Sequence, residues 1–102
     1  CTPLLVAARH GFIKAFFICE EQGANIKELD SNGNHVIAIA AKSGCYEIVN
    51  SLTSRHKFDV DEINTPNNYS QTALMLAAEH GHYNTVKCLL RYGADISKTD
   101  VN

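Results

Sequence analysis

The chain has 102 residues, of which 45% are hydrophobic and 20% charged, and its formal net charge is −2. This length suits one domain, and the near balance of charges argues against a polybasic arm for nucleic acid or a membrane surface. The longest apolar runs are far shorter than the roughly 20 residues that span a bilayer. We therefore expect one globular domain, residues 1–102, that neither binds nucleic acid nor inserts into a membrane.

The first elements in chain order are two short helices joined by a tight turn. Thr2 and Pro3 are typical of a helix start, because threonine caps free amides and proline at the first position leaves none unpaired. Gly11 predicts the end of that helix, since glycine readily adopts the left-handed conformation. A second helix is expected over about 12–22 and ends at Gly23. An extended finger with a turn at 30–33 follows.

This unit recurs along the chain. Alanine pairs are found at 7–8, 40–41 and 77–78, and each is followed three residues later by glycine. The offsets between the pairs are 33 and 37 residues, which indicates three repeats at about 2–34, 35–71 and 72–102. Because one such unit cannot bury its apolar face alone, the repeats are expected to stack into a solenoid.

The middle repeat departs most from this pattern. His35 stands where the other repeats have a capping threonine, and His56 stands where they have Gly23 and Gly93. Two routes stay open at His56: a left-handed residue, which costs on the order of 1 kcal/mol, or a different exit from the helix. The second offset between alanine pairs exceeds the first by four residues. We assign one of these extra residues to the region of Lys57 and three to the finger over 64–71. That finger should therefore be longer than its counterpart, with Tyr69 near its tip.

The sequence resembles the ankyrin repeat family over its whole length. The resemblance rests on these segments: Thr2-Pro3-Leu4 with Ala7-Ala8, Gly23-Ala24-Asn25-Ile26, Asp30-x-x-Gly33, Thr72-Ala73-Leu74 with Ala77-Ala78, Gly81-His82, Leu89-Leu90 and Gly93-Ala94-Asp95-Ile96. It implies an all-α solenoid of stacked helix-turn-helix repeats with β-hairpin or loop fingers. The family's histidine after Thr-Pro-Leu is absent, being replaced by Leu5, Ala38 and Met75.

Apolar residues are expected to be exposed at both ends of the solenoid. They are Leu4, Leu5, Val6, Phe16 and Phe17 at one end, and Leu74, Met75, Leu76, Leu89 and Leu90 at the other. Terminal repeats of complete arrays usually carry a polar outer face. We therefore expect this chain to be a fragment of a longer array.

Motifs for catalysis, metals or cofactors are weak. His80 and His82 form a potential metal pair without a recognisable third ligand, and the acidic residues Asp59, Asp61 and Glu62 lack the glycine of a calcium loop. These three acidic residues fit a solvated strand edge better than a calcium site. No phosphate-binding glycine loop or cysteine–histidine site is recognisable. We expect no enzyme activity, cofactor or metal.

The four cysteines, at 1, 19, 45 and 88, show no Cys-x-x-Cys spacing. Two disulfides in a secreted protein are one possibility. The alternative that we favour is four reduced thiols in an intracellular, cytoplasmic setting, because Cys19 and Cys88 lie in apolar helical stretches.

The family resemblance implies a protein–protein interaction module whose concave face, formed by fingers and first helices, binds a partner. That partner would be another protein or another domain of the same chain. The alternative is a structural or regulatory segment of a larger enzyme, channel or signalling protein, acting as spacer or intramolecular regulator. The expected contact residues are Arg9, His10, Ser31, Asn32, Asn34, Lys42, Ser43, Asn67, Asn68, Tyr69, Gln71, Glu79 and His80.

Overall fold

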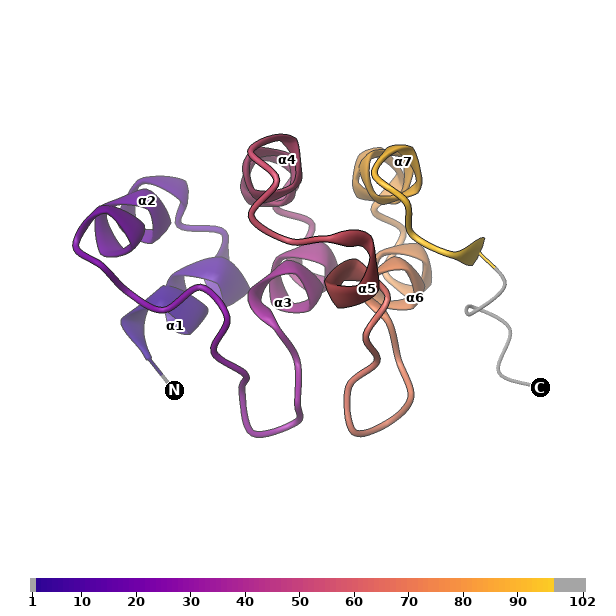
Figure 1. Cartoon of the computed structure of the whole chain (residues 1–102), viewed down its shortest axis with the longest axis horizontal. Coiled ribbons are helices and arrows are strands. Elements are labelled where there is room, and N and C mark those ends of the chain that lie inside the picture. Colours follow the sequence, from indigo (N-terminus) through magenta and orange to yellow (C-terminus); the bar gives the residue numbers. More distant parts are fainter. Residues whose placement is uncertain (1, 97–102) are drawn as a thin grey trace.

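The computed structural model describes residues 2–96 and confirms the predicted all-α solenoid (Figure 1). Three inner helices form one row and three outer helices a second row, with the fingers extending beyond the inner row. The inner helices are α1 (Pro3–His10), α3 (Val36–Ser43) and α6 (Ala73–Glu79), and the outer helices are α2 (Ile13–Glu21), α4 (Tyr46–Ser54) and α7 (Tyr83–Arg91). A short helix, α5 (Val60–Ile63), precedes the second finger. Residues 2–96 contain no strand, so the fingers are loops.

Each inner helix begins at a side-chain cap. The Leu5 amide donates to Thr2 Oγ1 at 3.3 Å, and the Met75 amide donates to Thr72 Oγ1 at 3.3 Å. In the middle repeat the Ala38 amide donates to His35 Nδ1 at 3.2 Å. The histidine therefore takes over the threonine's role, with a ring nitrogen that must be unprotonated.

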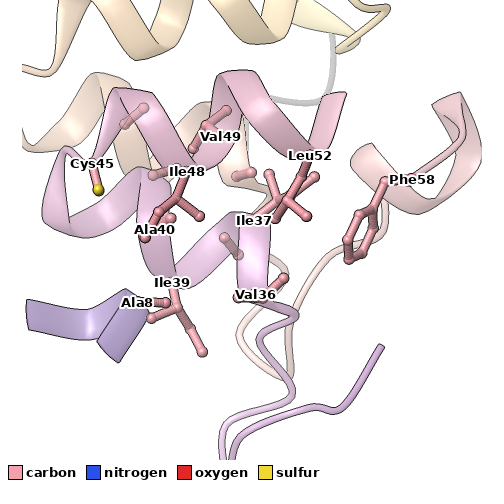
Figure 2. Packing of buried hydrophobic residues seen from close by; sticks show 14 of the residues in the cluster. Ala8, Val36, Ile37, Ile39, Ala40, Cys45, Ile48, Val49, Leu52 and Phe58 are labelled. Carbon is pink, nitrogen blue, oxygen red and sulfur yellow. The ribbon is translucent and has the colours of Figure 1, made fainter. Parts of the chain in front are cut away.

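The core lies between the two rows of helices and between neighbouring inner helices. Ala8, Ala41 and Ala77 are fully buried, because their small side chains let the inner helices approach closely. Figure 2 shows Ile37 of α3 pointing toward Leu52 of α4, and both side chains are fully buried. This packing between repeats supplies the burial that a single repeat lacks.

His56 takes the left-handed route. Its φ angle is 57°, and the amides of His56 and Lys57 donate to Thr53 O at 3.1 Å and Leu52 O at 3.0 Å. Gly93 ends α7 with the same pair of bonds one repeat later. The histidine thus completes the helix cap that glycine makes elsewhere, in a conformation that costs an L-residue energy.

The prediction of a longer second finger is wrong. The first finger (residues 30–34) and the second finger (residues 67–71) have the same length and the same bonds: the Asp30 amide donates to Asn34 O at 3.0 Å, and the Asn67 amide donates to Gln71 O at 2.9 Å. The extra residues form α5 instead. Its start is a capping box, in which Asp59 and Glu62 each accept a hydrogen bond from the other's amide.

The acidic residues 59–62 are therefore a helix start and not a strand edge. Sequence reasoning missed the signal, which is the Asp-x-x-Glu spacing of the capping box ahead of Ile63. Ile63 is 2% exposed and anchors α5 to the core.

The apolar ends are smaller than expected. Most of the residues predicted to be exposed there are buried: Leu4, Leu5, Phe16, Leu74, Leu76 and Leu89 are each at most 3% exposed. Of the residues predicted to be exposed at the ends, Val6 and Leu90 are open to solvent, with exposed fractions of 36% and 40%. Three repeats therefore bury most of their own apolar side chains.

Candidate functional site

A groove of about 460 Å³ lies between the inner helices and the first finger. Its lining residues come from the last turn of α1, the middle and last turn of α3, the residue that follows α6, and the finger itself. They are Arg9, Asp30, Asn32, Asn34, Ile39, Lys42, Ser43 and His80. Ile39 is 6% exposed and forms an apolar floor, and Figure 2 shows it on the side of α3 away from the α4 residues.

The groove brings together residues from all three repeats that sequence analysis predicted as contacts. Those that line it are Arg9, Asn32, Asn34, Lys42, Ser43 and His80. The others lie outside this lining: His10, Ser31, Asn67, Asn68, Tyr69, Gln71 and Glu79. Because the inner helices repeat in register, corresponding positions of successive repeats lie side by side.

The two fingers are joined to one another. Asn67 Nδ2 donates to Asn34 Oδ1 at 2.8 Å, and the Asn68 amide donates to Asn32 O at 2.9 Å. Asn34 is 8% exposed and Asn67 is partly buried. These two asparagines therefore hold the fingers together, a structural role that differs from the surface contact expected of them.

Asp30 belongs to the groove but was not among the predicted residues. Its Oδ1 accepts from the amides of Asn32 at 2.9 Å and Asn34 at 2.8 Å, and its Oδ2 accepts from Asn34 Nδ2 at 3.2 Å. The signal was the Asp-x-x-Gly turn, since aspartate commonly binds backbone amides two or more residues ahead.

Two predicted contact residues are positioned by backbone carbonyls. Ser43 Oγ donates to Ala8 O at 2.9 Å and so ties α3 to α1. His80 Nδ1 lies 2.9 Å from Leu76 O and, because a carbonyl only accepts, must carry the proton. Both side chains are held at the groove edge by the helices beneath them.

The suspected metal pair serves another purpose. His82 Nε2 lies 3.0 Å from Lys42 O and so bridges two repeats, and its ring stacks on His80 with centroids 6.2 Å apart. Within residues 2–96 no three His, Cys, Asp or Glu side chains gather in a way that could hold a metal ion.

Tyr69 is a predicted contact residue that is largely exposed. It lies in the second finger and is 67% exposed, and its amide donates to Asn67 Oδ1 at 2.8 Å. This exposure means that the ring is not packed into the body of the third repeat. Asn84 on α7 is exposed on the outer row.

The cysteines that the structure describes carry free thiols: Cys19, Cys45 and Cys88. Burial raises the pKa of the Cys45 thiol, which therefore stays protonated at neutral pH. Cys88 Sγ lies 3.7 Å from Thr53 Oγ1 in the interface of α4 and α7. These surroundings suit packing rather than nucleophilic chemistry. Cys1 lies outside the described residues.

A second, larger groove of about 700 Å³ lies on the outer row between α2 and α4. Its walls include Phe17, Ile18 and the ion pair of Arg55 Nη2 with Glu20 Oε1 at 2.8 Å. It was not predicted, and it draws on two repeats, whereas the finger-side groove combines all three. We regard the finger-side groove as the candidate site.

Comparisons with known proteins agree with this architecture. A sequence model described as ankyrin repeats (3 copies) matches residues 4–100. Alpha-latrocrustotoxin-Lt1a from Latrodectus tredecimguttatus is 44% identical over 71 residues, which cover 69% of this chain and 5% of the toxin. The probable E3 ubiquitin-protein ligase XBOS32 from Oryza sativa subsp. japonica is 32% identical over 99 residues, which cover 95% of this chain and 19% of the ligase. The chain thus spans less than a fifth of the length of either relative.

A solved structure shows the same fold. It is a chain in the structure of the predatory endopeptidase Bd0816 from Bdellovibrio bacteriovorus in complex with immunity protein Bd3460. The TM-score is 0.81 at 25% identity, and the match covers 94% of this chain and 48% of that one. Among the helices of residues 2–96, none has the length and apolar composition to cross a membrane.

Proposed function

Because this chain belongs to the ankyrin repeat family, we propose that it is a non-catalytic module that binds a partner protein in the finger-side groove. Ankyrin repeats are generally protein-interaction modules, and the fold is generally non-catalytic. The partner is another protein or another domain of the same chain. The proposal includes a cytoplasmic setting, which the free thiols of Cys19, Cys45 and Cys88 support.

One observation carries the proposal: a single groove is lined by predicted contact residues from all three repeats. Its floor is the apolar Ile39 and its rim is polar, an arrangement common in protein interfaces. Tyr69 adds a rigid, exposed ring on the second finger, which is hydrogen-bonded to the first, and tyrosine is enriched among the residues that dominate binding energy.

The test is affinity capture from native lysate with two matched variants. Tyr69→Ala should weaken binding of the captured partner by about 1–2 kcal/mol, because it removes an exposed interface ring, and should leave the melting temperature unchanged. Asn84→Ala, on the exposed side of α7, should change neither. A partner that binds both variants and wild type equally would contradict the proposal.

A second candidate function is that of a spacer or intramolecular regulator in a larger enzyme, channel or signalling protein. The observation in its favour is length: this chain spans only 5% of the toxin and 19% of the ligase that it resembles. Its test is whether the purified repeats bind the remainder of their own full-length chain in trans. Loss of that binding in Tyr69→Ala would place the intramolecular contact on the second finger.

A further inference from the structure

Corresponding positions at the ends of the three inner helices carry an ordered set of charges. Arg9 in α1, Lys42 in α3 and Glu79 in α6 occupy the same place in successive repeats, and all three are exposed. We call this set the charge ladder. Along the row of inner helices its order is positive, positive, negative: Arg9 and Lys42 line the groove, and Glu79 directly precedes the lining residue His80.

Helix stability alone explains only part of the charge ladder. Cations near a helix C-terminus are favoured by the partial negative charge of the terminal carbonyls. Arg9 and Lys42 lie in the last turns of their helices and fit this rule. Glu79 is the last residue of α6 and opposes it. Its charge is therefore better explained by a binding partner than by folding.

Asp30 is the acidic residue among those that line the groove. The Asp30 carboxylate accepts three hydrogen bonds within the first finger, from the amide of Asn32 and from the amide and side chain of Asn34. A partner that enters the groove therefore meets Arg9 and Lys42 in its lining and Glu79 beside His80 at its edge.

We propose, resting on the function proposed above, that the groove selects an extended segment of a partner protein with two acidic side chains followed or preceded by a basic one. Charge complementarity of this kind fixes the register of a bound segment and rejects wrong partners. Packed helices lie about 8–10 Å apart, and an extended chain rises about 3.3 Å per residue. The three charges of the segment should therefore stand about three residues apart.

The first test compares three synthetic twelve-residue peptides of serine, alanine and glycine. They carry Glu-x-x-Glu-x-x-Lys, the reverse order Lys-x-x-Glu-x-x-Glu, or the scrambled order Glu-x-x-Lys-x-x-Glu. One of the first two, according to chain direction, should bind about two- to tenfold more tightly than the scrambled peptide at low salt. NMR titration should show shifts at the amides of Ile39 and Lys42. High salt should reduce the preference.

The second test reverses the charge at one end of the ladder. A fourth peptide carries Glu-x-x-Glu-x-x-Glu. Wild type should prefer the peptide that ends in lysine, whereas Glu79→Lys should prefer the all-acidic peptide. The matched control is Glu21→Lys, which makes the same substitution at the exposed end of α2 on the outer row and should keep the wild-type preference.

Three results would overturn the proposal: equal binding of ordered and scrambled peptides, no detectable binding of either ordered peptide, or a wild-type preference for the all-acidic peptide. The last would indicate a general anion-binding patch. If the charge ladder fails in this way while Tyr69→Ala still weakens a captured partner, the groove binds proteins without this charge order. If Tyr69→Ala also has no effect, the proposed function fails as well.

Discussion

His35 combines a structural role with a titratable group. Its ring is 5% exposed, Nδ1 accepts the Ala38 amide, and Nε2 has no hydrogen-bond partner. Burial lowers the pKa of His35 below its ordinary value of 6.5, against the opposing effect of the Glu62 carboxylate, while Lys27 lowers it further. Protonation would place a second N–H against the Ala38 amide and break the cap of α3. The folded chain therefore requires the neutral ring.

The first prediction follows from this requirement. Below about pH 6.5 the unfolded chain takes up a proton at His35 that the folded chain does not, so the free energy of unfolding falls as pH falls. Denaturant titrations from pH 8 to pH 5 should show this loss in wild type. His35→Thr restores the cap that Thr2 and Thr72 form in the other repeats and should remove this part of the pH dependence. Parallel pH curves for both proteins would exclude His35 as the cause.

His56 supports a second prediction at the scale of one residue. Its left-handed conformation (φ 57°) costs about 1–2 kcal/mol, and glycine avoids this cost but loses roughly 0.4–1 kcal/mol to the flexibility of the unfolded chain. His56→Gly should therefore raise the free energy of unfolding by roughly 0.5–1 kcal/mol, as measured by denaturant titration. Lys57→Gly is the control, because Lys57 does not have a positive φ angle, and it should destabilise. A destabilised His56→Gly variant would refute the argument.

Among the elements, α5 connects neighbouring repeats. Glu62 forms an ion pair with Lys27 of the first repeat, which lowers the pKa of that carboxyl. At the other side, Asn64 Nδ2 donates to Gly93 O at 3.1 Å, and the Asp95 amide donates to Asn64 Oδ1 at 2.7 Å. The short helix therefore links the first repeat to the exit of the third.

The third prediction is that removing the link through Asn64 lowers the stability of the folded chain. Asn64→Ala deletes both hydrogen bonds to the third repeat, and since each is worth about 1 kcal/mol net, thermal and denaturant unfolding should show a loss of about 1–2 kcal/mol. Hydrogen exchange should rise first at the end of α7. Asn84→Ala removes an exposed asparagine of the outer helix α7 without such bonds and should be neutral. Unchanged stability in Asn64→Ala would mean that α5 contributes nothing to the coupling.

The sequence predicted the three inner helices because their signals are local: a capping residue, an alanine pair and a terminal glycine. The outer helices followed from apolar spacing in the first repeat and from the repeat pattern. It did not predict α5, because four residues form too short a segment to show helical periodicity. The extra residues were consequently assigned to the finger. At His35, cap preferences favour threonine, serine or aspartate, so a histidine cap becomes visible only when the ring and the Ala38 amide are placed together.

At the scale of the whole molecule, the candidate site follows from the stacking of repeats. Arg9 and Lys42, like Ser43 and His80, could be predicted as neighbours because the repeat period places corresponding residues side by side. The structural role of Asn34 could not be predicted from the sequence, because it depends on a hydrogen bond from Asn67 in the next repeat. Burial of a polar side chain through such a contact cannot be inferred from composition or residue spacing.

The last prediction concerns the open face of the third repeat. Ala78 is exposed, whereas its counterparts Ala8 and Ala41 are fully buried by the next repeat, and Leu90 is 40% exposed. We propose, as the sequence led us to expect, that a further repeat packs here. Because stability in such arrays is approximately a sum of repeat and interface contributions, a consensus ankyrin repeat fused after the third repeat should raise the melting temperature by several degrees. At about 4–8 °C for each kcal/mol in a domain of this size, even a weak interface is measurable by calorimetry. The control is the same fusion with Ala78→Glu, which places a charge in the new interface and should cancel the gain. An increase that survives Ala78→Glu would show that the added repeat is stabilising without using this face.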